Sequence, residues 1–242
     1  MTDAELAAEL AKAAGQLLID LRDAGTHVGK ALGAEGDALA NRYLIDALRA
    51  ARPDDALLSE EEKDSPARLG ASRCWIIDPL DGTREYGEGR SDWAVHVALA
   101  VDGVATLGAV ALPGLGLVLR SDRPLAPAAA NAPLRMVVSR TRPPPAAVHV
   151  SVVLQGDLVP MGSAGAKAMA VVRGEADVYL HSGGQYEWDS CAPVAVALAH
   201  GLHCSRIDGS PLVYNQADSY LPDLLICRAE LAASILAMVR DI

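Results

Sequence analysis

Residues 74–83, which read CWIIDPLDGT, restrict the fold of this chain more than any other stretch. The first four residues form a continuous apolar run, and such a run bounded by turn residues predicts a short β-strand that is covered on both faces. Pro79 has no N–H to donate to a neighbouring strand, so we expect the strand to end there. The strand would then deliver Asp78 and Asp81 to its carboxyl end, where open α/β sheets place their ligands.

These two aspartates predict a metal site, because carboxylates that are held so close repel each other. Two unit charges about 4 Å apart repel by roughly 4 kcal/mol at an effective dielectric constant of about 20. A bound cation removes that cost, and hard oxygen ligands suit Mg²⁺. The alternative is a polar turn in which an aspartate only caps a helix.

Composition limits both the core and the partners. Apolar residues make up 51% of the 242 residues, but aromatic residues make up only 4% and phenylalanine is absent, so the core must consist of Ala, Val, Leu and Ile. The length fits one large domain or two small ones. The net charge of −10 argues against binding to nucleic acid, which requires a basic face. A small anionic substrate is compatible, since bound metal ions reverse the local charge.

The four cysteines are scattered over positions 74, 191, 204 and 227. They are too few for a disulfide framework and their spacing does not match a zinc site, so we expect reduced thiols in a cytoplasmic protein. The N-terminal region is acidic and has no uninterrupted apolar stretch, and no run elsewhere is long enough to span a membrane. We therefore expect neither a signal peptide nor a membrane partner.

Hydrophobic periodicity predicts two N-terminal helices. Apolar residues recur at helical spacing over 3–23 and again over 37–51, and the glycine-rich segment 29–36 predicts a loop. Asp37 would then lie at the N-terminus of the second helix, where an N-cap is the alternative to a functional role. Further along, we expect a mobile loop over 84–89, a strand over 148–154 and a loop at 182–184.

Three further polar residues border or interrupt apolar segments. Glu60 follows the apolar pair at 57–58 and is placed to point inward. Asp189 lies at the start of an Ala-rich helix, in the segment WDSCAP at 188–193. His96 lies inside an apolar strand, where we expect a core residue with its hydrogen bonds satisfied.

Glu60 after Ser59, the motif DPLDGT at 78–83 and the motif WDSCAP at 188–193 together resemble the inositol monophosphatase superfamily of metal-dependent, lithium-sensitive phosphatases. The resemblance covers most of the chain. It implies an α/β (α+β) fold, the five-layered α-β-α-β-α sandwich, with an N-terminal α+β domain over 1–130 and a C-terminal α/β domain over 131–242. Family members are commonly dimers, so the resemblance implies a homodimer.

The resemblance also implies a site for two Mg²⁺ ions. The ligands of the first ion would be Glu60, Asp78 and the main-chain carbonyl of Leu80, and those of the second Asp78, Asp81 and Asp189. Asp37 would support Thr83 in activating water and could hold a third, weaker ion. It takes the place of the acid in the family motif V-T-x-A-D, although the chain reads Glu35-Gly36-Asp37 there, without the usual valine and threonine.

The hydrolysis of a phosphate ester requires such groups. Phosphate monoesters hydrolyse so slowly unaided that enzymes reach accelerations of up to about 10²¹-fold. Two metal ions about 3.5–4 Å apart can hold the attacking and leaving oxygens in line. Thr83, with Asp37 or Glu60, would accept the proton of the attacking water. The N–H groups of Gly82 and Thr83 would bind phosphate oxygens if they open a helix.

Within the superfamily the chain resembles the CysQ-type 3′-phosphoadenosine 5′-phosphate phosphatases. This resemblance lies in VVSR at 137–140, in Gly162-Ser163 with Lys167, and in RGEADVY at 173–179. Arg140 and Lys167 would bind the second, 5′ phosphate; the alternative is that both are ordinary surface cations. The substrate contacts that the resemblance implies are Glu60, Leu80, Asp81, Gly82, Thr83, Ser139, Arg140, Ser163, Lys167 and Asp189.

We therefore expect a Mg²⁺-dependent phosphatase that removes the 3′ phosphate of 3′-phosphoadenosine 5′-phosphate in support of sulfate assimilation. Where CysQ relatives have an aromatic-rich stretch similar to Tyr-Pro-Arg-Phe, this chain reads YLHS at 179–182. An inositol-1-phosphate or fructose-1,6-bisphosphate phosphatase therefore stays open as the alternative. A non-catalytic phosphate-binding protein is an alternative of another class, although all the metal carboxylates are present.

Overall fold

The computed structural model describes residues 1–126 and 128–240 as helices and two mixed sheets. The helices are α1 (Asp3–Asp23), α2 (Gly29–Ala51), α3 (Thr83–Gly87), α4 (Pro145–Val153), α5 (Ala164–Val172), α6 (Glu187–Ala199) and α7 (Ala232–Val239). The strands are β1 (Ala56–Ser59), β2 (Arg73–Asp81), β3 (Ala94–Val101), β4 (Val104–Leu112), β5 (Leu117–Arg120), β6 (Arg135–Ser139), β7 (Asp157–Met161), β8 (Val178–Tyr186), β9 (His203–Ser205) and β10 (Tyr220–Cys227).

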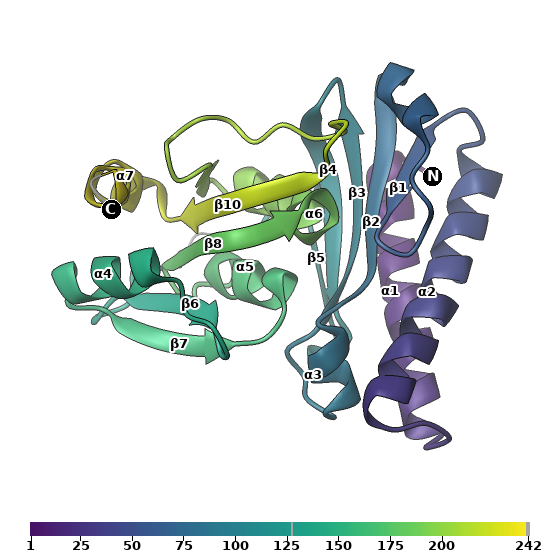
Figure 1. The fold of residues 1–242 in the computed structure, drawn as a ribbon, viewed down its shortest axis with the longest axis horizontal. Helices are drawn as coiled ribbons and strands as arrows, with labels where there is room; N and C mark the ends of the chain where they lie inside the picture. The colour runs from purple at the N-terminus through teal and green to yellow at the C-terminus, as the bar shows by residue number, and fades with distance from the viewer. Residues whose placement is uncertain (127, 241–242) are drawn as a thin grey trace.

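The helices and sheets form five layers (Figure 1). The first sheet has the strand order β1-β2-β3-β4-β5, and α1 and α2 pack on its outer face. The second sheet has the order β7-β6-β8-β10-β9, and α4 and α7 pack on its outer face. Helices α5 and α6 lie between the sheets and share one core with both. The predicted α-β-α-β-α sandwich is confirmed.

Strand β2 is buried on both faces, as predicted from its apolar run. Trp75 and Ile77 pack against α1 and α2, whereas Cys74 and Ile76 pack towards α5 and α6, which follows the two-residue period of a strand. The expectation that Pro79 ends the strand is wrong. Pairing with β3 shifts in register between Asp78 and Asp81, and such an irregularity accommodates a residue that cannot donate to the ladder.

Helix α2 begins at Gly29, so the predicted loop over 29–36 is wrong and Asp37 lies inside the helix rather than at its N-terminus. Glycine disfavours helix, but here close packing requires it. A Cβ atom on Gly33 would lie 2.6 Å from Thr83 Cγ2, and one on Gly36 would lie 3.0 Å from Leu18 Cδ2. The glycines thus let α2 approach β2 and α3 closely enough to present Asp37 to Thr83.

Three other local predictions are wrong. Residues 148–154 lie mostly in α4, which starts with a proline at its first turn and ends at Val153; its valines favoured a strand locally, but the helix packs on the second sheet. The segment after Gly82 is the short helix α3 rather than a mobile loop. Residues 182–184 belong to β8, which pairs with β10 on both sides of a bulge.

The division into domains 1–130 and 131–242 stays a prediction. The strands of the first sheet end at Arg120 and those of the second begin at Arg135, yet the core around α5 and α6 draws on both. All four cysteines are free thiols. Among the residues that the structure describes, no helix is both long and apolar enough to cross a membrane.

Candidate functional site

Three carboxylates from distant parts of the chain meet at the carboxyl end of β2. Asp78 and Asp81 come from β2, and Asp189 comes from the first turn of α6. Each offers one oxygen, and these oxygens lie within 4.8 Å of one another. The group is able to hold a metal ion, since carboxylate oxygens are the ligands that hard divalent cations prefer.

Asp81 is held in place from three sides. Its Oδ1 accepts a hydrogen bond from Ala164 N at 3.1 Å, and its Oδ2 accepts one from Gly165 N at 2.6 Å. Both donors lie in the first turn of α5, where unpaired N–H groups and the helix dipole favour a negative charge. His96 Nε2 lies 3.2 Å from Asp81 Oδ2. Asp81 thereby connects β2 of the first sheet to a helix of the layer between the sheets.

His96 is completely buried, as predicted for a core residue, but it also contacts the acidic cluster. Its Nδ1 lies 2.9 Å from the carbonyl oxygen of Trp188, the residue before Asp189. The ring requires a glycine opposite it, because a Cβ atom on Gly165 would lie 2.0 Å from His96 Nε2. The sequence analysis did not predict the contact with Asp81. This contact depends on the register of β2 and β3, which pairs Asp78 with His96.

Asp189 is fixed by the local structure at the start of α6. Tyr186, the N-cap residue of that helix, donates its backbone N–H to Asp189 Oδ2 at 2.7 Å. A carboxylate in the first turn of a helix is favoured by the helix dipole. The remaining oxygen of Asp189 can therefore face Asp78 and Asp81.

Burial and the close spacing of the charged groups shift the pKa values of the residues in this cluster. Burial, together with the neighbouring carboxylates, raises the pKa of Asp78 well above its ordinary value and that of Asp189 to about 6. Burial alone would also raise the pKa of Asp81, but the contact with His96, the hydrogen bond from Gly165 N and the charge of Lys167 together outweigh it, and the net shift is downward. Burial acts to lower the pKa of His96, but the contact with Asp81 has the larger effect, and the net shift is upward. Three carboxylates held this close together favour a bound cation.

Glu60 lies near the cluster but outside the group of three oxygens that lie together. It follows β1 and is exposed. Although the residue as a whole is exposed, its carboxylate is partly removed from water by surrounding protein atoms, and this raises its pKa. The negative charges of Asp189, Asp37 and Asp81 raise the pKa further, to about 8. The acidic residues that act on Glu60 are therefore those of the candidate site.

Thr83 contacts both Asp37 and the main chain of Leu80, which lies between Asp78 and Asp81 in the sequence. Its Oγ1 lies 3.2 Å from the carbonyl oxygen of Leu80 and 3.5 Å from Asp37 Oδ1, and it can donate to either. Asp78 Oδ1 accepts a hydrogen bond from Leu80 N at 3.0 Å, which fixes the turn. Gly82 has a φ of 89°, a conformation that suits glycine, and α3 starts at the next residue. Burial, and then the charge of Glu61, raises the pKa of Asp37 to about 7.

A cavity of about 520 Å³ opens beside Asp37 and Thr83. Its other lining residues come from the start of α2 and from α3, and they are Gly29, Lys30, Ala34, Arg84, Gly87 and Glu88. The two residues predicted to activate water therefore face a space that is open to small molecules.

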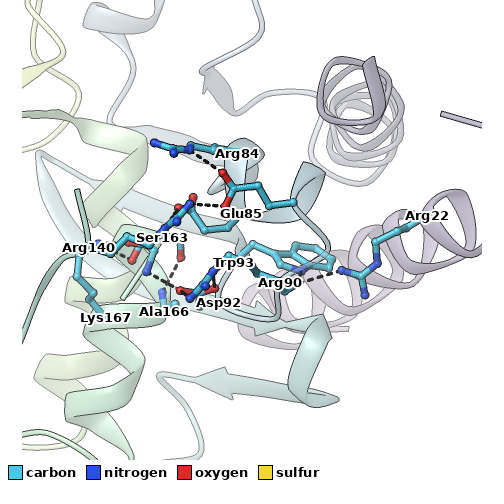
Figure 2. A network of polar contacts seen from close by, with 12 residues as sticks. Arg22, Arg84, Glu85, Arg90, Asp92, Trp93, Arg140, Ser163, Ala166 and Lys167 are labelled. Carbon is cyan, nitrogen blue, oxygen red and sulfur yellow. Dashed lines mark hydrogen bonds and ion pairs between the residues drawn. The ribbon is translucent and has the colours of Figure 1, made fainter. Parts of the chain in front are cut away.

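Arg140 and Lys167, which were predicted to bind a second phosphate, both contact oxygen atoms of the protein itself (Figure 2). Arg140 lies 2.8 Å from Glu85 and 2.5 Å from Glu88, so it links the end of β6 to α3. Lys167 is only 5% exposed, and its Nζ donates to the carbonyl oxygens of Ser163, at 2.7 Å, and of Gly162. Lys167 is thus not a surface cation, and the phosphate-binding roles of both residues stay predictions.

The two predicted serines also have structural partners. Ser163 is the N-cap of α5, and its Oγ accepts a hydrogen bond from Ala166 N at 2.8 Å. Ser139 ends β6, and its Oγ accepts one from Arg142 N at 3.3 Å. Ser139 therefore lies at the carboxyl end of β6, and Ser163 lies at the start of α5. Contact of either serine with a substrate stays a prediction.

Comparison with known proteins gives consistent relatives. The chain is 53% identical to a protein of Mycobacterium leprae (strain TN) named 3′-phosphoadenosine 5′-phosphate phosphatase, over 100% of this chain and 95% of that protein. It is 30% identical to a protein of Escherichia coli (strain K12) named 3′(2′),5′-bisphosphate nucleotidase CysQ, over 88% of this chain and 94% of that protein.

Solved structures share the fold. A CysQ from Bacteroides thetaiotaomicron, described as a bacterial member of the inositol monophosphatase family, superposes with a TM-score of 0.79 at 23% identity, covering 93% of this chain and 97% of that chain. The inositol monophosphatase II from Staphylococcus aureus superposes with a TM-score of 0.80 at 18% identity, covering 96% and 94%. The sequence pattern of the inositol monophosphatase family matches residues 2–241, and the chain therefore belongs to that family.

Proposed function

We propose that this protein is a Mg²⁺-dependent phosphatase that removes the 3′ phosphate of 3′-phosphoadenosine 5′-phosphate, giving AMP and phosphate. The observation that carries the proposal is the convergence of Asp78, Asp81 and Asp189, with ligand oxygens within 4.8 Å of one another, beside Thr83 and Asp37. The name of the Mycobacterium leprae relative, at 53% identity over the whole chain, supports the choice of substrate.

The residues of the cluster fit Mg²⁺, because all their donor atoms are oxygens and their negative charges lie unfavourably close. Two ions would be held by Glu60, Asp78, Asp81, Asp189 and the carbonyl of Leu80, and a third, weaker one by Asp37. When bound, Mg²⁺ would lower the pKa of a coordinated water and neutralise charge on the phosphate.

Thr83 and Asp37 supply a route for the proton of the attacking water. The Thr83 hydroxyl can donate to Asp37 Oδ1, 3.5 Å away, while its own lone pairs accept a hydrogen bond from water. Burial raises the pKa of Asp37, which favours the acceptance of a proton by this carboxylate. Glu60 is the other candidate base.

The substrate contacts are proposed as predicted from the sequence. The N–H groups of Gly82 and Thr83 would bind oxygens of the reacting phosphate, and Glu60, Leu80, Asp81 and Asp189 would contact it beside the ions. The residues proposed to contact the rest of the substrate are Ser139, Arg140, Ser163 and Lys167. Arg140 can take part only if a phosphate displaces Glu85 or Glu88 from its guanidinium.

The proposal also extends to the cell. A phosphatase of this kind would act in the cytoplasm, would support sulfate assimilation by removing 3′-phosphoadenosine 5′-phosphate, and would be inhibited by lithium. We propose a homodimer as its assembly. Phosphate release measured in the presence of Li⁺ tests the inhibition by lithium. The particle mass measured by light scattering tests the homodimer.

A substrate panel tests the proposed function. The purified protein with Mg²⁺ is given 3′-phosphoadenosine 5′-phosphate, inositol 1-phosphate or fructose 1,6-bisphosphate, and phosphate release yields kcat/KM for each. We expect the bisphosphorylated nucleotide to be preferred by at least about tenfold, which corresponds to about 1.4 kcal/mol of transition-state binding. Equal values, or a preference for inositol or sugar phosphate, would overturn the choice of substrate.

A further inference from the structure

Two tyrosines are unusual in this chain because their rings are exposed. The chain has three tryptophans and six tyrosines, and among the residues that the structure describes the exposed aromatic side chains are Tyr186 and Tyr220, each 46% exposed. They lie together, with ring centroids 6.0 Å apart and planes at 80°. Exposed aromatic surface that is gathered in one place is characteristic of binding sites.

The two rings are held by their surroundings. Tyr186 stacks on Trp188, with centroids 4.8 Å apart and planes at 8°. Tyr220 pairs with Tyr186 across β8 and β10 and packs over Gly184, where an added Cβ atom would lie 2.7 Å from its ring. We call Tyr186, Trp188 and Tyr220 the aromatic platform.

The aromatic platform is joined through its backbone to Asp189, one of the candidate metal ligands. The backbone N–H of Tyr186 is the group that donates to Asp189 Oδ2 at 2.7 Å, and Trp188 precedes Asp189 in the chain. Trp188 is further fixed through its carbonyl oxygen, which lies 2.9 Å from His96 Nδ1. Partly exposed aromatic side chains are thus anchored at the residues that flank Asp189, within the reach of a group that is attached to a phosphate bound there.

We propose that the aromatic platform, with Tyr186 at its centre, stacks against the adenine base of the substrate. This inference rests on the proposed function and deepens it by naming the residues that select a nucleotide. Every base offers a flat π-face, and stacking on an aromatic side chain changes affinity by about tenfold or more. Inositol and fructose carry hydroxyl groups and no π-face, so the platform gives them no comparable contact.

The test compares a substrate that has a base with one that lacks it. For the wild-type protein and for Tyr186→Ala, Tyr186→Phe and Tyr220→Ala, kcat/KM is measured with 3′-phosphoadenosine 5′-phosphate and with glycerol 2-phosphate, which is also an ester of a secondary alcohol. We expect Tyr186→Ala to lose about tenfold more on the nucleotide than on glycerol 2-phosphate, mainly through KM. Tyr186→Phe keeps the ring and should keep the preference.

Tyr43→Ala is the matched control. Tyr43 is a partly buried tyrosine of α2 that lines a cavity beside Leu17 of α1, and the Tyr43→Ala change should leave the preference for the nucleotide unchanged. If the wild-type protein shows no preference for the nucleotide, the proposed function itself fails. If the wild type prefers the nucleotide and folded Tyr186→Ala keeps that preference in full, the platform does not bind the base and this inference alone is overturned.

Discussion

One buried imidazole ring connects two candidate metal ligands that are far apart in the sequence: His96 Nε2 lies 3.2 Å from Asp81 Oδ2, and His96 Nδ1 lies 2.9 Å from the carbonyl oxygen of Trp188, beside Asp189. The ring is completely buried and abuts Gly165. Groups that orient a metal ligand in this way affect metal affinity although they do not touch the metal.

His96→Ala should weaken the binding of Mg²⁺ by about 10- to 100-fold, because Asp81 loses a neighbour that fixes its orientation. Calorimetric titration of the folded protein with Mg²⁺ measures this directly. His200→Ala is the control, since His200 lies at the far end of α6, where its Nδ1 is 2.7 Å from the carbonyl oxygen of Val196. An unchanged affinity in folded His96→Ala would show that Asp81 is positioned by α5 alone.

Gly33→Ala should lower kcat without a comparable loss of stability. Alanine is favoured over glycine inside a helix by about 1 kcal/mol, but its Cβ atom would lie 2.6 Å from Thr83 Cγ2. Thr83 must then move, and displacement of a catalytic group by about 1 Å costs roughly 100-fold in rate. Gly70→Ala is the control, since its Cβ atom would meet nothing within 4 Å. Full activity of Gly33→Ala would mean that the Thr83 position tolerates displacement.

Asp55 should make the fold sensitive to acid. It accepts hydrogen bonds from Arg73 Nε at 2.7 Å and from Trp75 Nε1 at 2.8 Å, and the Arg73 contact is the main reason why its pKa is lowered. A lowered pKa stabilises the fold fully above the unfolded value of about 3.9, and this contribution is lost as the pH falls through the folded value.

Asp55→Asn should therefore lower the free energy of unfolding by about 1–3 kcal/mol at neutral pH, and the difference from the wild type should shrink below pH ~4. Urea unfolding at several pH values measures both effects. Asp54→Asn is the control, because the neighbouring Asp54 is exposed. A difference that stays constant down to pH ~3 would contradict an ionic role for Asp55.

Local sequence patterns were sufficient to predict the strand that carries Asp78 and Asp81 and the helix that carries Asp189. The apolar run at 74–77 predicted a strand buried on both faces, and its end placed Asp78 and Asp81 together. The segment WDSCAP predicted that Asp189 opens a helix, as it does in α6. The five layers followed from the family resemblance rather than from any periodicity.

Features that depend on contacts between distant segments could not be predicted. The glycines of α2 disfavour helix locally and are explained only by the approach of Thr83. The role of His96 depends on the register of β2 and β3. The engagement of Arg140 with Glu85 and Glu88 depends on α3, which local composition predicted to be a loop.

The melting temperature as a function of Mg²⁺ concentration tests the metal site most directly. A ligand that binds only the folded state stabilises it by about 2.7 kcal/mol at 100 times its Kd. The wild-type melting temperature should therefore rise with Mg²⁺, and Asp78→Asn, which removes a shared ligand of both proposed ions, should respond far less. A wild-type protein indifferent to Mg²⁺, or an equal rise in Asp78→Asn, would contradict the assignment of these carboxylates to a metal site.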